Sequence, residues 1–220
     1  MNFGIQLLPA AWLWSGHLLY ALILIQALRW AQWSRLKNTQ DIHILLASSI
    51  ILWLVWRLEA GITAGMEFHL LLVPSVTLMF GWPFAVLMTS LAQGLLTLEG
   101  QAAAVSYSLN TLCNGIVPIG ITYWIYRLSY CWLPKHFFIY IFICVFAGSA
   151  LAMLASRLTG LGILLASGAY TLEVLGDEPL FIIVMLFPEA FMNGLIMTVL
   201  VVYYPQWVSS FSDEQYLRGK

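Results

Sequence analysis

The stretch GMEFHLLLVPSVTLMFG, residues 65–81, sets a histidine and a carboxylate against the start of a long apolar run. His69 and Glu67 are costly to keep in or near a bilayer, because lipid removes the hydration that stabilises polar and charged groups. Such residues are therefore candidates for a substrate or ion site. The alternative for His69 is a structural role, as a helix cap or as the partner of a backbone carbonyl.

The composition of the whole chain is that of a polytopic membrane protein. Of the 220 residues, 61% are hydrophobic and 9% are charged, and the mean hydropathy is +0.87. A soluble domain of this length does not bury so much apolar side chain. The nine Lys and Arg residues are scattered and form no basic patch, which argues against nucleic-acid binding. We expect a multi-pass protein of the inner (plasma) membrane whose immediate surroundings are the lipid bilayer.

The hydropathy pattern predicts an all-α fold, a single integral membrane domain over residues 1–220 with about seven transmembrane helices. In this interpretation, residues 1–9 are an N-terminal segment inserted toward the bundle, 10–204 form the helical bundle and 205–220 are a cytoplasmic tail. The predicted spans lie at about 12–32, 42–56, 70–80, 84–98, 103–126, 137–158 and 180–204. The third span is short and contains Pro74.

The distribution of basic residues predicts the orientation. Cytoplasmic loops of membrane proteins carry an excess of Lys and Arg. With the N-terminus outside and the C-terminus in the cytoplasm, seven of the nine fall inside and only Arg57 and Arg157 fall outside. This orientation also places the Met1 amine and His69 on the same, outer side. The basic residues on the cytoplasmic side would be Arg29, Arg35, Lys37, Arg127, Lys135, Arg218 and Lys220.

Several short motifs occur in the order known from one transporter family. The N-terminus MNFGIQLLP, residues 1–9, matches M-H-I-x-E-G-F-L-P in length and in its final Leu-Pro. His69 precedes Gly81 by 12 positions, as in H-P-T-G-x-G-x-x-x-x-x-F-G, and Phe80 matches as well. Further matches are Gln93, Asn110-Thr111-Leu112, Tyr126-Arg127, Glu189 to Gly194, and Pro205. On these residues the chain resembles the CbiM/NikM type, the membrane-embedded substrate-binding (S) components of energy-coupling factor (ECF) transporters for cobalt and nickel.

The resemblance implies a metal site built from four nitrogens. They are the Met1 amine, the backbone nitrogen and the imidazole of residue 2, and the imidazole of the loop histidine, His69. Such a set suits Ni(II), Co(II) or Cu(II). In this chain Asn2 replaces the second-position histidine and keeps only its backbone nitrogen, and residues 70–74 replace the P-T-G-x-G that follows the family's loop histidine. The metal candidates are Met1, Asn2 and His69.

Four further residues are candidates for substitute or supporting ligands. Met66 or Glu67 could replace the missing donor, and Met66 would shift the preference toward copper because thioethers favour Cu(I). Glu189, beside Pro188 in the last span, could orient an imidazole or the N-terminal amine; the alternative is an interhelical hydrogen bond from a protonated acid. Asn110 shares a helix face with Asn114, and this pair is expected to join helices rather than to ligate.

The predicted function is capture of a divalent transition metal as substrate, of the cobalt/nickel class with copper as a further candidate. No organic cofactor is expected. The chain has no Walker A motif and is not expected to be an enzyme, so ATP hydrolysis would come from separate ABC ATPase subunits through a transmembrane coupling (T) subunit. The alternative is an S-component-like protein that has lost the metal site and binds another small ligand or acts as a structural subunit. A third interpretation, an intramembrane hydrolase using Glu189 and His69, has no supporting motif.

Overall fold

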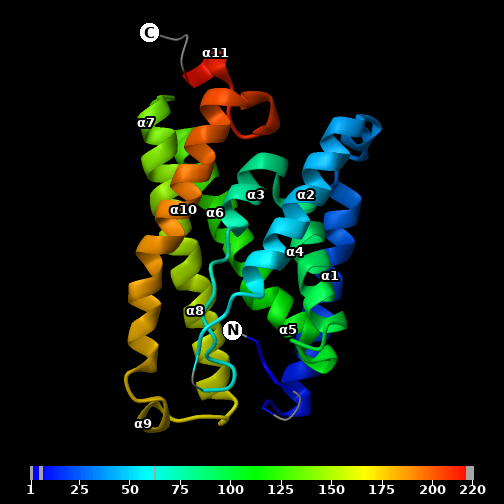
Figure 1. Cartoon of the computed structure of the whole chain (residues 1–220), viewed down its shortest axis with the longest axis vertical. Coiled ribbons are helices and arrows are strands. Elements are labelled where there is room, and N and C mark those ends of the chain that lie inside the picture. The colour runs from blue at the N-terminus through cyan, green and yellow to red at the C-terminus, as the bar shows by residue number, and fades with distance from the viewer. Residues whose placement is uncertain (1, 5–6, 62, 217–220) are drawn as a thin grey trace.

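The chain folds into an upright bundle of helices in a computed structural model that describes residues 2–4, 7–61 and 63–216 (Figure 1). The described part contains helices and one isolated β-bridge, between Ala60 and Phe68. This confirms the all-α prediction. In chain order the elements are α1 (Ala10–Trp30), η1 (Trp33–Lys37), α2 (Thr39–Trp56), α3 (Val73–Phe80), α4 (Trp82–Leu98), η2 (Ala104–Ser106), α5 (Tyr107–Thr111), η3 (Leu112–Ile116), α6 (Val117–Trp132), α7 (Phe137–Ile139), η4 (Tyr140–Ala147), α8 (Gly148–Ala166), α9 (Leu172–Leu175), η5 (Glu178–Leu180), α10 (Phe181–Tyr203), η6 (Pro205–Trp207) and α11 (Asp213–Tyr216).

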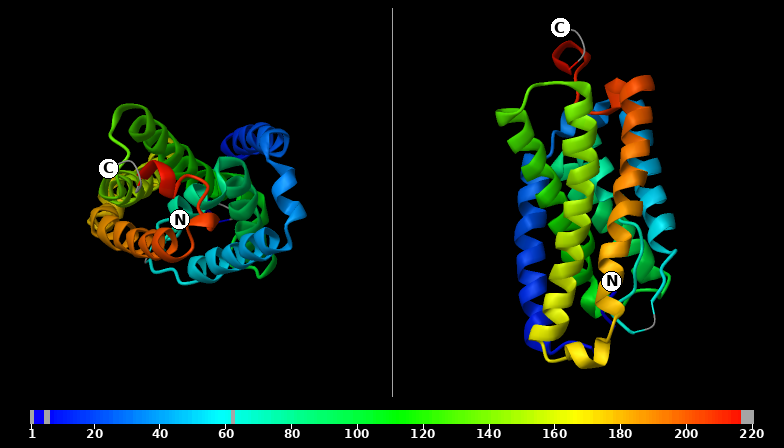
Figure 2. Two further views of the ribbon diagram at one scale, coloured as in Figure 1. Left: turned by 90° about the horizontal axis from the view of Figure 1, so that it is seen from above. Right: turned by 90° about the vertical axis from the view of Figure 1, so that its left-hand side faces the viewer.

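Successive helices run along the long axis of the bundle in alternating directions (Figures 1 and 2). The α5 helix, the π-helix η3 and α6 follow one another without a break, and so do α7, the π-helix η4 and α8. The start of α1 and the end of α10 lie at opposite ends of the bundle (Figure 1). The helix α3 lies in the interior, and all eight of its residues are buried.

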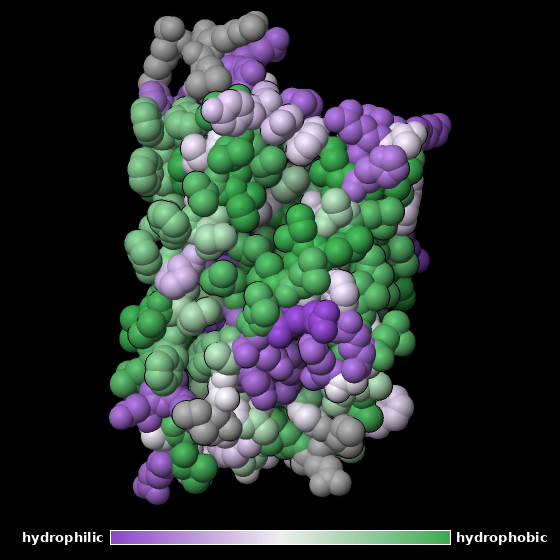
Figure 3. Space-filling view, in the orientation of Figure 1, coloured by the Kyte–Doolittle hydropathy of each residue, from purple (hydrophilic) through white to green (hydrophobic). Residues whose placement is uncertain are grey.

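Four helices of the described part are long and apolar enough to cross a membrane, namely Ala10–Trp30, Thr39–Trp56, Phe137–Ala166 and Glu178–Tyr203. The apolar helix α4 is one residue below that length, with 17 residues. Hydrophobic residues cover the middle of the face in Figure 3, whereas hydrophilic ones gather near the two ends and over one area of the lower half. A multi-pass membrane protein is thus confirmed, while the number of seven spans stays a prediction.

The third predicted span differs from the structure, because only its second part is helical. Residues 69–72 form no helix, and α3 begins at Val73, just before Pro74. Proline favours the first turn of a helix, where its missing N–H would have no partner anyway. Leu72 adopts a left-handed conformation with φ of 54°. Gly81, at φ of 82°, ends α3 and starts the turn into α4, a conformation that favours glycine.

Two side chains of α10 cap the N-terminus of α3. The two carboxylate oxygens of Glu189 accept the N–H groups of Leu71 (2.7 Å) and Leu72 (2.9 Å). The side-chain oxygen of Asn193 accepts the N–H (3.0 Å) and the hydroxyl (2.7 Å) of Ser75. The first N–H groups of a helix have no intrahelical partner, and leaving them unpaired in an apolar interior is costly. The sequence places no capping side chain at Leu72, so α10 supplies the cap from outside the segment.

We predict that Glu189→Gln lowers the midpoint of thermal unfolding in detergent. The glutamine amide group would direct its own N–H groups toward one of the two backbone N–H donors, so one buried donor loses its acceptor at a cost of about 1–3 kcal/mol. Glu173→Gln is the matched control, because Glu173 is exposed on α9. An equal midpoint for both variants would contradict the capping role of Glu189.

Candidate functional site

Residues 57–72 join α2 to α3 and place His69 inside the bundle. Their first part forms a loop that is closed by two backbone hydrogen bonds between Ala60 and Phe68 (2.9 and 2.7 Å). Gly65 sits in the turn between them at φ of 87°, and a Cβ there would lie 2.7 Å from a side-chain carbon of Leu7. Glycine is therefore required both by the backbone conformation and by the close approach of the N-terminal segment.

Residues 69–72 run through the interior, and side chains from three helices satisfy their backbone groups. Trp56 of α2 donates its indole N–H to the Leu71 carbonyl (2.9 Å). Arg157 of α8 donates to the His69 carbonyl (2.8 Å), and Glu189 of α10 accepts from Leu71 as described above. Non-helical backbone is tolerated at membrane depth only where protein surrounds and satisfies it. The position of His69 is thus set by three long-range contacts.

The His69 imidazole has one nitrogen available as a ligand. His69 is 2% exposed, and its ring packs 5.5 Å from the ring of Trp56. Nδ1 lies 3.0 Å from the Leu70 carbonyl, which can only accept, so Nδ1 carries the proton. Nε2 then holds the lone pair, and it is buried without a partner in the described part of the chain. An imidazole that donates from Nδ1 and keeps the lone pair on Nε2 is neutral, the form that binds metals.

Asn2 and Phe3, in the described part of the N-terminal segment, lie inside the bundle. Asn2 is 8% exposed and Phe3 is fully buried. The Phe3 N–H donates to the side-chain oxygen of Asn110 (2.8 Å). In Figure 1 the chain begins, in dark blue, in the lower half of the bundle among the helices. The predicted ligand Met1 lies outside the described residues.

Two carboxylates of the α2–α3 segment hold Asn2. Glu59 accepts from the Asn2 side-chain amide (2.7 Å), and Glu67 accepts from the Asn2 backbone N–H (3.2 Å). Glu67 also accepts from the N–H of Gly65 (3.0 Å). Partial burial and the nearby Glu67 carboxylate raise the pKa of Glu59. The side-chain oxygen of Asn2 is buried without a partner among the described residues. Sequence reasoning named Glu67 but missed Glu59.

The other predicted ligands have different surroundings. Met66 is fully buried in an apolar cluster that includes Phe3 and Leu8. Asn110 holds the N-terminal backbone, as described. Glu189 is occupied by the backbone N–H groups of Leu71 and Leu72 and by the Asn193 amide (2.8 Å). Glu189 therefore holds the backbone of Leu71 and Leu72, the residues that follow His69 and Leu70.

Arg157 is a buried residue that sequence reasoning placed wrongly. The sixth span was predicted to end near residue 158, with Arg157 at its outer edge, but α8 continues to Ala166 and Arg157 is fully buried. Besides the His69 carbonyl, its guanidinium donates to the side-chain oxygen of Asn114 (3.2 Å). The sequence did contain a signal for this residue, because Arg157 lies inside an apolar run. A charged residue in such a run is a candidate for a functional role.

The structure brings Asn2, Glu59 and Glu67 together, and His69 follows Glu67 by two residues. In the described ranges no three or more His, Cys, Asp or Glu side chains are arranged to hold a metal ion. Near the N-terminal segment, His69 Nε2 is the side-chain nitrogen of a histidine that the described part places without a partner.

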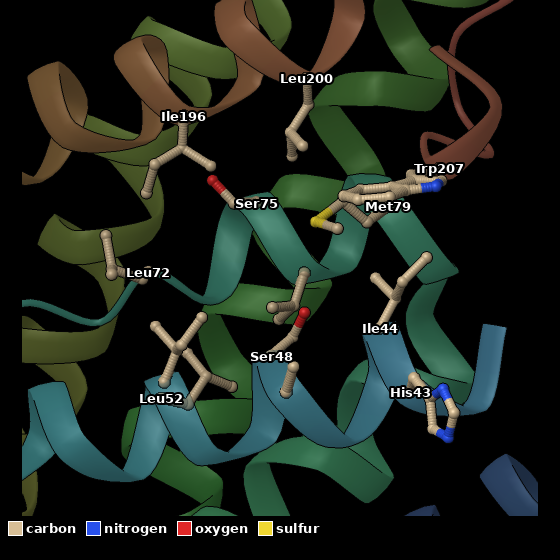
Figure 4. Close-up of a pocket in the computed structure, with 13 residues that line it drawn as sticks. His43, Ile44, Ser48, Leu52, Leu72, Ser75, Met79, Ile196, Leu200 and Trp207 are labelled. Atoms are coloured by element: carbon tan, nitrogen blue, oxygen red, sulfur yellow. The ribbon is translucent and has the colours of Figure 1, made fainter. Parts of the chain in front are cut away.

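Two cavities lie on either side of residues 69–72. The first, here called the His69 cavity, has a volume of about 450 Å³ and is lined by Leu58, Ala60, Gly61, Phe68, His69, Leu70, Glu178, Phe181, Val184 and Met185. The second, here called the α3 cavity, also measures about 450 Å³ and lies between α2, α3 and α10. Figure 4 shows side chains such as Leu52, Ser75 and Ile196 converging on it, with Trp207 at one end.

Comparison with known proteins defines the class. A family model described as cobalt uptake substrate-specific transmembrane region (CbiM) matches residues 4–207. No curated protein and no solved structure matches the chain. Together with the apolar helices, the match defines a membrane component of a transport system and not an enzyme, which removes the hydrolase interpretation.

The chain belongs to the CbiM family of cobalt-uptake substrate-specific membrane components. The family match begins at Gly4, so it does not include Met1, Asn2 or Phe3.

We predict that Arg157→Met destabilises the protein. The substitution keeps much of the side-chain volume but removes the donor to the buried His69 carbonyl, at a cost of about 1–3 kcal/mol. The check is thermal unfolding in detergent beside Arg127→Met, since Arg127 is exposed on α6. If both variants unfold at the same temperature, Arg157 does not hold the His69 segment.

Proposed function

We propose that this protein is the substrate-binding (S) component of an ECF-type importer, and that it captures Co(II) from the outer side of the membrane. The Met1 amine, the Asn2 backbone nitrogen and His69 Nε2 would be its ligands. The observation that carries this proposal is the buried Nε2 of His69, which has no partner among the described residues, in a bundle that also buries Asn2 and Phe3. A neutral imidazole in such a position is ready to accept a metal.

The donor types favour cobalt or nickel over Cu(I). Imidazole and amine nitrogens suit these borderline ions, whereas Cu(I) prefers thioethers. Met66 is the thioether closest in sequence to His69, and it packs in the apolar cluster with Phe3. It would have to leave that cluster to bind a metal. The buried side-chain oxygen of Asn2 is a candidate for a weak additional ligand in place of the family's imidazole.

Release of the metal would require partner subunits. The sequence carries no Walker A motif, so ABC ATPases acting through a T subunit would supply the energy. We further propose seven passes with the N-terminus outside and the C-terminus in the cytoplasm. Three passes would then be α4, the continuous α5–η3–α6 run, and α3 together with the non-helical residues 69–72. The alternating directions of these segments in Figure 1 support this count.

Metal binding tests the proposed site. Purified protein without an N-terminal tag should bind Co(II) at unit stoichiometry in equilibrium dialysis. His69→Ala removes the imidazole ligand, and one extra residue before Met1 removes the amine from its position, so either change should abolish binding. His43→Ala is the matched control, because His43 lies in the first half of α2, away from the proposed ligands, and lines the α3 cavity. Unaltered binding in both altered proteins would refute the site.

The native cysteines test the orientation. Cys131, near the end of α6, is exposed, whereas Cys113 and Cys144 are buried. With the C-terminus in the cytoplasm, a membrane-impermeant maleimide should label Cys131 in inside-out vesicles but not in intact cells. Cys131→Ser should remove the label. In that background Glu173→Cys should be labelled in intact cells, and the reverse pattern would contradict the proposed orientation.

A second candidate function is binding of a different small ligand by a protein that keeps the S-component fold. Asn2 in place of histidine and the mostly apolar His69 cavity favour it. Metal analysis of untagged protein distinguishes the two. Protein that is purified free of metal and does not bind added cobalt or nickel would favour this second function.

A further inference from the structure

The C-terminal part of the chain folds back over the end of the buried helix α3. Residues 208–216, here called the C-terminal strap, follow α10 and the short helix η6. Seen from above in Figure 2, this red segment lies over the interior of the bundle. The strap binds the last residues of α3, whereas His69 lies before the first residue of that helix. The strap therefore covers the end of α3 that faces away from His69.

Backbone and hydroxyl groups of the strap cap the C-terminus of α3. The N–H of Ser209 donates to the Met79 carbonyl (3.0 Å), and the N–H of Ser210 donates to the Leu78 carbonyl (3.2 Å). The hydroxyl of Ser210 donates to the same Leu78 carbonyl (2.8 Å). The last carbonyls of a helix have no intrahelical partner, and in an apolar interior they need one from elsewhere. Since Glu189 of α10 caps the other end, both ends of α3 are held by the chain after residue 180.

An aromatic cluster fixes the strap to the π-helix η4. The ring of Tyr140 on η4 lies 5.1 Å from the ring of Phe211 and 5.4 Å from that of Tyr216. The Tyr140 hydroxyl lies 2.7 Å from Oγ of Ser210. Because the hydrogen of Ser210 Oγ is donated to Leu78, Tyr140 is the donor in this contact. Residues in π-helical conformation are rare and are found frequently at functional sites.

On the side of α6, the strap borders a polar cavity of about 330 Å³. A polar space of this size holds water. Close to this side of the chain, Trp207 Nε1 and Asp213 Oδ1 are buried without a partner among the described residues. Detachment of the strap would give these two groups access to water, and this offsets part of the hydrogen bonding that detachment breaks. The cavity is lined by Tyr126, Arg127, Tyr130, Ser209, Ser210, Phe211, Ser212 and Gln215.

We propose that the C-terminal strap is a latch on α3, closed while the metal is captured and detached when the metal leaves at the opposite end of the bundle. This proposal rests on the proposed function for its cargo. With the strap closed, α3 is fixed at both ends between His69 and that opposite end. With the strap detached, Glu189 and Asn193 still hold the start of α3, while its last turn is free to move.

A native thiol near the strap reports detachment. Cys144 is buried on η4, one turn after Tyr140, and belongs to the same core cluster as Phe211 and Tyr216. The protein is studied in detergent with the exposed thiol removed by Cys131→Ser. We expect N-ethylmaleimide to label Cys144 slowly, at a rate set by detachment of the strap.

Two variants weaken the closed state without changing the apolar core. Ser210→Ala removes the hydroxyl that joins α3 to η4 and should raise the rate at Cys144 about tenfold, which corresponds to ~1.4 kcal/mol. Tyr140→Phe keeps the ring and should raise the rate by a smaller factor. Glu214→Gln, exposed on α11, is the matched control and should leave the rate unchanged. The buried Cys113 on η3 should keep its rate in every variant. An unchanged rate at Cys144 in Ser210→Ala, or an equal rise at both cysteines, overturns the latch.

A cross-link tests whether detachment is needed for release. Ser210→Cys and Tyr140→Cys are combined in a chain that carries Cys113→Ala, Cys131→Ser and Cys144→Ala. The two new thiols are separated by about the length of a tyrosine side chain, which a short bismaleimide can span. In cells that contain the whole transport system, the linked chain should still bind cobalt, but its uptake should fall at least tenfold. Each single-cysteine chain, treated in the same way, should keep its uptake. Equal uptake by the linked and single-cysteine chains overturns the proposal.

The outcomes separate this proposal from the proposed function, because the labelling of Cys144 needs no cobalt. Strap-dependent labelling in a purified protein that does not bind Co(II) overturns the proposed function and leaves the detachable strap standing. Normal binding of Co(II), together with labelling that ignores Ser210→Ala, overturns the latch and leaves the cobalt site standing.

Discussion

The interior of this protein depends on two hydrogen bonds. The Glu189 carboxylate accepts them from the backbone N–H groups of Leu71 and Leu72. It joins α10 to the start of α3, the buried helix in the middle of the bundle. A free backbone N–H costs far more inside a membrane protein than at a surface, because no water is present to replace the lost acceptor. Since the carboxylate satisfies two such groups at once, the chain can run in a non-helical path for residues 69–72. That path leaves His69 in the interior with Nε2 unpaired among the described residues.

The same solution recurs at the N-terminus. Asn110 accepts the N–H of Phe3, while Glu67 accepts that of Asn2. In both places a side chain from a distant part of the sequence accepts the backbone N–H groups. In a helix, the carbonyl groups of the preceding turn accept them. The two non-helical segments also meet each other, since Gly65 packs closely against Leu7 and Glu67 binds Asn2.

The helical fold and the break between residues 80 and 84 could be predicted from the sequence, because runs of apolar residues, glycine and proline determine local structure directly. Arg157 was misplaced, since counting basic residues assigns each one to a loop and α8 continues nine residues past it. The partners of Glu189 could not be predicted either: they lie 118 and 117 positions away, and a kinked helix with a glutamate suits a ligand or a cap equally well. Asn110 was expected to join helices, whereas its side-chain oxygen accepts the N–H of Phe3, in the non-helical N-terminal segment.

Leu72 carries conformational strain at the start of α3. An L-residue in the left-handed conformation is disfavoured by roughly 1–2 kcal/mol, and the N–H of Leu72 in that conformation is bound by Glu189. Loss of the Glu189 contact would allow Leu72 to relax toward ordinary backbone angles, which would change the direction of residues 69–71 relative to α3. His69 and Leu70 line the His69 cavity and Leu72 lines the α3 cavity, so one change in backbone angle would reshape both cavities together.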